Sequence, residues 1–197
     1  MKKVLGVLSS LAMLSLVVAG CGMGKSATDA AIAMSQSALD SAKAKAMNIA
    51  PDQVSTIQAA IDTAKAIAGR GDYRGAIEAI KPIPEQVKAM SDGLAAKEQA
   101  LRGEWQQMQG LSASVEQFKA QVDKLAALKK LPAGMDATKL DAAKAALATM
   151  TQAWGEAQTA FQGGNLAEAM AKAGTVKSLL TQGLSAMGMP LPEALKS

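Results

Sequence analysis

Cys21 is the only cysteine in the 197-residue chain, and its thiol has the most distinctive chemistry of any side chain in the sequence. A thiolate is a nucleophile and a metal ligand, whereas a lone cysteine without such a role is a small buried apolar side chain. One cysteine excludes an intramolecular disulfide. The chain also has no histidine, which removes histidine metal ligands, the Ser-His-Asp and Cys-His arrangements and most general bases. We therefore expect a protein that is not an enzyme and has no metal or cofactor site.

Cys21 ends an N-terminal stretch with the layout of an export signal. Lys2 and Lys3 give a positive start, residues 4–19 are apolar apart from one glycine and three serines, and Ala19-Gly20 precedes the cysteine. A retained transmembrane anchor is the alternative, because about 17 apolar residues are the lower limit for a membrane-spanning helix. The two small residues before Cys21 favour cleavage.

The sequence Val18-Ala19-Gly20-Cys21 resembles the lipobox of bacterial lipoproteins: a branched apolar residue, two small residues and a cysteine. The resemblance implies that the Cys21 thiol receives a diacylglyceryl chain and that a protease removes residues 1–20. The new amino group is often acylated as well, and two chains anchor a protein stably where one does not. Gly22 in place of an aspartate implies the outer membrane under the sorting convention of enteric bacteria. We expect residues 21–25 to be the lipidated N-terminus and a tether.

The composition of the remaining chain favours slim, closely packed helices. Loss of Lys2 and Lys3 leaves 19 basic residues against 17 acidic ones, and no basic block with interleaved aromatics is present, so nucleic-acid binding is not expected. Lys129-Lys130 is interpreted as a solvated helix end. Only 3% of the residues are aromatic. Apolar burial must therefore come mainly from Ala, Leu, Ile, Val and Met, which suits an all-α fold.

Apolar residues recur every three or four positions and predict an elongated antiparallel helical bundle. Turn and proline signals separate the helices near Ala50-Pro51, at 69–72, at 81–84, at 131–136 and at 163–165. One long central helix is expected from about Pro84 to Lys130, with the spacing of a coiled-coil seam after Leu101. Its glycines, Gly93, Gly103 and Gly110, each weaken a helix by up to about 1 kcal/mol, so we expect bending near them. Residues 188–197 are expected to be a flexible tail.

The helical body repeats itself with a shift of 93 residues. The segment Gly71-Asp72-Tyr73 matches Gly164-Asn165-Leu166, and the preceding apolar faces agree as well. The matched face positions are Val54 with Leu147, Ile57 with Met150, Ile61 with Trp154 and Ala64 with Ala157. This pattern predicts two helical repeats, 26–100 and 101–187, each containing one copy of a duplicated hairpin. The alternative is that any two alanine-rich amphipathic helices align in this way.

The first hairpin resembles a family of alanine-rich bacterial envelope lipoproteins whose domain has no assigned function. The residues that carry the resemblance lie within about residues 50–90. They are Ala50-Pro51, Ala60, Ala64, Gly71-Asp72-Tyr73 and Ala76. The second copy departs from the pattern because Leu166 replaces the tyrosine. A tetratricopeptide-like repeat is the alternative, although the helices are longer than that repeat permits.

Methionines and tryptophans on the helix faces are interpreted as core residues. Six methionines have this spacing, and core filling is favoured over a flexible apolar-ligand surface. They are Met34, Met47, Met90, Met108, Met150 and Met170. Met187-Gly188-Met189 is the only close methionine pair of the kind that binds copper, and a flexible tail explains it as well. Trp105 and Trp154 are expected to stack where the repeats meet, or to line a groove for a lipid or a peptidoglycan fragment.

The acidic residues do not form a paired-carboxylate signature, since they match ordinary polar helix faces. Those considered are Asp123, Asp136, Asp141, Glu156 and Glu168. A hydrolase that uses serine and lysine is the least supported class, because no such pair can be nominated. We therefore expect a lipid-anchored, non-enzymatic envelope protein that faces the periplasm and binds an envelope protein or the cell wall. The alternative is a periplasmic carrier of an apolar ligand, such as a lipid, held between helices.

Overall fold

The computed structural model describes residues 24–132, 134–192 and 195, and the described residues form α-helices and no strand. The all-α prediction is therefore confirmed. Cys21 and residues 1–20 lie outside the described residues. The helices are α1 Lys25–Ile49, α2 Pro51–Gly69, α3 Tyr73–Ile80, α4 Ile83–Met108, α5 Gly110–Ala126, α6 Ala137–Gln162 and α7 Leu166–Ala186. Among them, no helix has both the length and the apolar character needed to cross a membrane.

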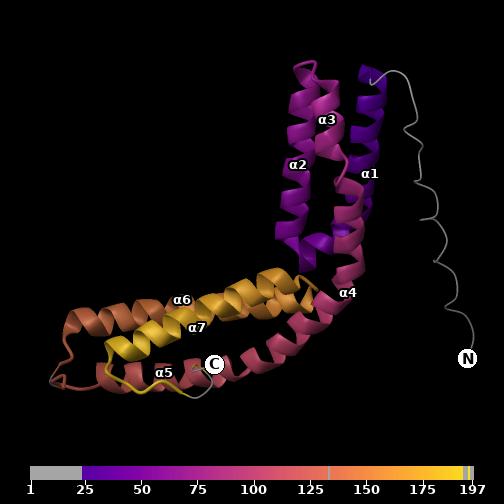
Figure 1. Ribbon diagram of the computed structural model, residues 1–197. Coiled ribbons are helices and arrows are strands. Elements are labelled where there is room, and N and C mark those ends of the chain that lie inside the picture. Colours follow the sequence, from indigo (N-terminus) through magenta and orange to yellow (C-terminus); the bar gives the residue numbers. More distant parts are fainter. Residues whose placement is uncertain (1–23, 133, 193–194, 196–197) are drawn as a thin grey trace, which may run out of the picture.

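The helices are arranged as two antiparallel bundles that share α4 (Figure 1). The N-terminal bundle consists of α1, α2, α3 and the first part of α4. The C-terminal bundle consists of the end of α4 with α5, α6 and α7, and it turns away from the first bundle, which gives the molecule a bent shape. Each bundle has its own buried core, one running from Ile32 to Leu94 and the other from Trp105 to Leu195.

The long central helix is present and has one interruption. α4 ends at Met108 and α5 begins at Gly110, while Gln109 between them keeps right-handed helical angles, φ −59° and ψ −27°. The chain therefore continues in a helical path from Ile83 to Ala126. The interruption lies beside Gly110, one of the three glycines at which bending was expected.

The two copies of the Gly-Asp/Asn turn have closely similar backbones. Gly71 and Gly164 have φ values of +83° and +79°, in the left-handed region that favours glycine. The next residue caps the following helix, with φ −85° and ψ 75° for Asp72 and φ −83° and ψ 76° for Asn165. Each cap oxygen accepts a hydrogen bond from the backbone N–H three residues later, at 2.8 Å from Gly75 and 3.3 Å from Glu168. This agreement favours duplication over chance alignment.

The correspondence continues into the third helix of each bundle. A shift of 93 places Ile83 on Val176 and Val87 on Leu180, and all four side chains are buried. Pro82 stands where α7 has Thr175. Proline lacks a backbone N–H and cannot sit inside a helix without disrupting it. The third helix is therefore split into α3 and α4 in the first bundle and unbroken as α7 in the second.

Three expectations need correction. Met34 and Met47 are 41% and 42% exposed, so they do not fill the core, whereas Met90 and Met150 are buried. The expected helix start at residue 26 moves by one residue, because α1 begins at Lys25; residues 21–23 of the expected tether lie outside the described residues. The stretch after residue 187 is not wholly loose, since three of its apolar side chains pack on the C-terminal core. These are Met189, Leu191 and Leu195.

Candidate functional site

An aromatic stack joins α4 to α6. The Trp105 ring lies 5.4 Å from the Trp154 ring and 4.6 Å from the Phe161 ring, and both pairs are within 10° of parallel. Trp154 and Phe161 are seven residues apart on α6, which is about 10.5 Å along a helix. This spacing leaves room for one ring between them, so Trp105 is inserted between Trp154 and Phe161. The predicted stacking of the two tryptophans is confirmed.

A groove of about 430 Å³ runs beside this stack. Besides the three aromatic residues, its lining consists of neutral polar side chains. They are Gln109, Ser112, Gln158 and Gln162. The Trp154 Nε1–H is buried and has no hydrogen-bond acceptor in the described part of the chain, an arrangement that costs stability. Sequence reasoning found the tryptophans and missed the glutamines, although Gln158 and Gln162 continue the Trp154 face at helical spacing.

A chain of charged contacts crosses from the N-terminal bundle to the stack. Lys45 of α1 lies 3.1 Å from one Glu98 oxygen, and Arg102 lies 3.2 Å from the other. The Arg102 guanidinium is also 5.7 Å from the centre of the Phe161 ring, within cation–π range. Hydrogen bonds from Lys45 and Arg102 lower the pKa of the Glu98 carboxyl below its ordinary value. These contacts join α1, α4 and α6 where the two bundles meet.

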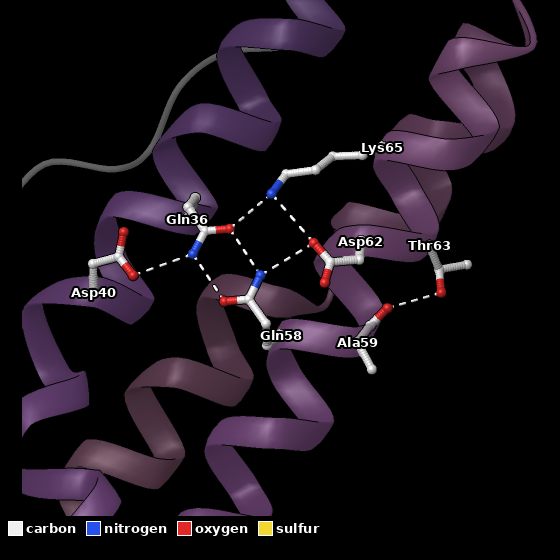
Figure 2. A network of polar contacts seen from close by, with 7 residues as sticks. All are labelled: Gln36, Asp40, Gln58, Ala59, Asp62, Thr63 and Lys65. Carbon is white, nitrogen blue, oxygen red and sulfur yellow. Dashed lines mark hydrogen bonds and ion pairs between the residues drawn. The ribbon is translucent and has the colours of Figure 1, made fainter.

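A polar network holds α1 against α2 (Figure 2). The Gln36 and Gln58 amides exchange two hydrogen bonds of 3.0 Å. Asp40 and Asp62 each accept a further hydrogen bond from these amides. The Lys65 ammonium bridges the Gln36 oxygen, at 2.9 Å, and the Asp62 carboxylate, at 3.3 Å. A one-residue slip of either helix would break the reciprocal pair, so the network fixes their register.

A second groove, of about 400 Å³, lies at the end of the N-terminal bundle where α1 begins and α2 ends. Lys25 and Asp29 of α1, Lys65 and Gly69 of α2, and Tyr73 of α3 are part of its lining. The Lys25 ammonium is 2.7 Å from the Asp29 carboxylate, and this contact raises the pKa of Lys25. The groove shows that the first turn of α1 lies beside the α2–α3 turn.

The other residues singled out from sequence are dispersed over the molecule. In the described part of the chain, no three carboxylate or thiol side chains are placed to hold a metal ion. Glu156 accepts hydrogen bonds from Gln152 and Lys172 and so ties α6 to α7. Lys172 and Gln152 lower the pKa of Glu156, and Glu156 raises the pKa of Lys172. Lys129-Lys130 is exposed in the α5–α6 connection.

No protein-family model, curated protein or solved structure matches the chain. The lipobox and the envelope-lipoprotein hairpin therefore stay predictions from the residues that carry them. The arrangement itself offers two open grooves and a set of helix-joining polar contacts.

Proposed function

We propose that the protein is a bacterial lipoprotein whose helical body is a non-enzymatic interaction module. It is held at an envelope membrane, the outer membrane facing the periplasm, by lipid on Cys21. The observation that carries the proposal is the placement of the only cysteine, directly after Val18-Ala19-Gly20 at the end of an export-signal-like stretch. The module would bind an envelope protein or the cell wall.

The start of α1 supports this proposal by limiting how the body is oriented. Lys25 follows Cys21 by four residues, a distance of at most about 14 Å in an extended chain. The anchor would therefore hold the end of the N-terminal bundle that contains the start of α1 and the α2–α3 turn. The C-terminal bundle lies beyond the opposite end of α1 (Figure 1). Its helix faces would be presented away from the membrane, where a periplasmic partner is accessible.

The alternative of an apolar carrier has less support. Both faces of the Trp105 ring are already covered by Trp154 and Phe161. The groove beside them is open to solvent, whereas carrier sites for apolar ligands enclose most of the ligand surface. The aromatic stack is better explained as packing that fixes α4 on α6.

Metabolic labelling with palmitate tests the anchor. We expect label in the wild-type protein and none in Cys21→Ala. A matched control, Cys21→Ala with Ser26→Cys, keeps one cysteine in the chain. It moves that cysteine five positions along the sequence, to the second residue of α1. This control is expected to stay unlabelled, because the small residues that precede Cys21 do not precede position 26. Unlabelled wild-type protein would show that the anchor proposal is wrong.

Photo-crosslinking in intact envelopes tests the interaction module. A photoreactive residue is placed at an exposed position of α6, such as Lys144, or at an exposed position of α2, such as Thr63. We expect a discrete crosslinked adduct from the α6 position. Protease should degrade the partner in this adduct if it is a protein, and a wall-degrading enzyme should do so if it is the cell wall. Equal, diffuse labelling from both positions would count against a module that presents the C-terminal bundle.

A further inference from the structure

The end of the N-terminal bundle carries two arginines with no internal role. Arg70 closes α2 and Arg74 is the second residue of α3, and both are exposed. Neither guanidinium has a hydrogen bond, ion pair or ring contact within the described residues. The neighbouring Asp72 carboxylate accepts from the Gly75 N–H as a helix cap. Both arginine charges are therefore exposed to solvent and free to bind a ligand outside the bundle.

The second copy of the turn shows that folding does not require these arginines. The shift of 93 places Gly163 at the position of Arg70 and Ala167 at the position of Arg74. The cap residues Asp72 and Asn165 nevertheless have nearly the same backbone angles, which differ by only 2° in φ and 1° in ψ. A helix cap of closely similar geometry forms without either guanidinium. The arginines are thus specific to the copy that lies at the start of α1.

We propose that this end of the molecule, formed by the α2–α3 turn and the start of α1, rests on the anionic headgroups of a phospholipid bilayer. This inference rests on the proposed function, because lipid on Cys21 is what brings the surface to the membrane. Lys25 lies next to the turn, since it lines one groove with Gly69 and Tyr73. The short chain between Cys21 and Lys25, a step of four positions, therefore also limits the distance of the turn from the bilayer.

The phosphate groups of anionic lipid headgroups are suitable ligands for the two exposed guanidinium groups. A guanidinium binds phosphate oxygens through two parallel hydrogen bonds. Cationic side chains are attracted to an anionic leaflet within about one Debye length, roughly 10 Å at 0.1 M salt. Each arginine close to such a surface favours contact about 5-fold. Two arginines cannot replace the lipid as an anchor, but they can keep this end of an anchored body against the membrane.

Hydrogen exchange on the lipidated protein in vesicles tests the inference. The protein is reconstituted into phosphatidylcholine vesicles or into vesicles that also contain phosphatidylglycerol, and exchange is followed in segment 66–76. The internal control is segment 159–169, the second copy of the same turn. We expect exchange in 66–76 to slow about 5-fold or more only in the anionic vesicles. We also expect 1 M salt to reverse the effect, because screening shortens to about 3 Å.

Two double variants distinguish an effect of the arginine-bearing surface from an effect of the protein's net charge. Arg70→Gln with Arg74→Gln should abolish the slowing, whereas Lys129→Gln with Lys130→Gln removes equal charge from the α5–α6 connection and should leave it intact. Equal exchange in the two vesicle types, or equal effects of the two double variants, would overturn the inference. The mass of the purified protein is measured first. Absence of lipid on Cys21 overturns both proposals, whereas lipidated protein without slowed exchange overturns only this one.

Discussion

The two bundles are built around the same turn but fill their interiors differently. The described core of the N-terminal bundle is aliphatic, with residues such as Ile57 and Ile61, and has no aromatic member. The core of the C-terminal bundle contains Trp105, Phe118 and Trp154. Large rings require space, and the third helix supplies it. Where the first bundle has buried Met90, the second has Gly183 packed against the Phe118 ring.

This difference shows how a duplicated scaffold diverges. The turn and its small buried alanines are the same in both copies, with Ala64 and Ala157 fully buried at matched positions. Two of the changed positions in the second bundle contact its first helix: Trp154 stacks on Trp105 of α4, and Gly183 packs against Phe118 of α5. The turn geometry is thus independent of how the rest of the core is filled, and the predictions below test that independence.

Removal of the Phe118 ring is expected to have the largest effect. Phe118 is fully buried, and truncation of a buried phenylalanine to alanine costs about 3–5 kcal/mol because it loses apolar contacts and leaves a cavity. Chemical denaturation of Phe118→Ala, followed by tryptophan fluorescence, measures the loss, since both tryptophans lie in the C-terminal bundle. Leu128→Ala is the control, because Leu128 is 45% exposed and should change stability by less than about 0.5 kcal/mol. A Phe118→Ala loss as small as the control's would show that the ring does not organise this core.

The next test copies the proline of the first bundle into the second. Thr175→Pro places in α7 the residue found at Pro82, and we expect a loss of about 3 kcal/mol or more because the proline ring disrupts the helix interior. Thr175→Ala is the matched control and should be nearly neutral, since Thr175 is exposed and alanine is a better helix former. If α7 tolerated the proline as the α3–α4 junction does, the difference between the third helices would not be due to that residue.

Glycine replacement at the two turns tests their equivalence directly. Gly71→Ala and Gly164→Ala should each cost about 1–2 kcal/mol, because only backbone strain is involved: no atom lies within 4 Å of the added Cβ at either site. Gly155→Ala is the control, since Gly155 is a helical glycine with the same open surroundings, and it should stabilise by up to about 1 kcal/mol. Thermal unfolding of the three variants compares them. Losses that differ by more than about 1 kcal/mol between the two turns would contradict their equivalence.

The sequence predicts the turns well because their chemistry is local. A Gly followed by Asp or Asn ends one helix and caps the next, whatever lies around it. The exposure of Met47 could not be predicted in the same way, because its helix is rich in alanine. Ala46 and Ala50 are buried while Met47 is 42% exposed, so close helix approach, which depends on the partner helix, decides which face is inside.

In the candidate sites too, features set by local sequence were predictable and features set by the packing of distant helices were not. The tryptophan stack was predictable because both residues have core spacing on their own helices. A groove lined by the tryptophans was the stated alternative, but its polar residues were not predicted. Gln158 and Gln162 come from α6, Ser112 comes from α5, and Gln109 lies at the interruption between α4 and α5. The contact of Arg102 with Phe161 likewise joins residues 59 positions apart, which no local pattern indicates.

The smallest expected effect is the pH dependence of the helix-joining ion pairs, one in each region. Glu98 and Glu156 have pKa values lowered from the ordinary 4.5 by their hydrogen-bonded cations. A carboxyl whose folded-state pKa is lowered stabilises the fold above its unfolded pKa, and this contribution disappears as pH falls through the folded value. Glu98→Gln and Glu156→Gln should therefore be less stable than the wild type at pH 7. The difference should shrink as pH falls below 4.5 and vanish only below the lowered folded-state pKa.

The stabilising contribution of Lys172 depends on pH in the opposite direction, because it is lost when the pH rises. Its pKa is raised from 10.5 by Glu156, so its contribution is present below 10.5 and is lost only as pH rises through the raised value. Glu104→Gln serves as the control, because Glu104 is exposed and has no ion-pair partner among the described residues. All these pairs are partly exposed to solvent, so salt should reduce the differences as well. A Glu156→Gln difference that persisted at low pH would mean that the side chain acts through packing, and charge pairing would then not be what joins α6 to α7 at this position.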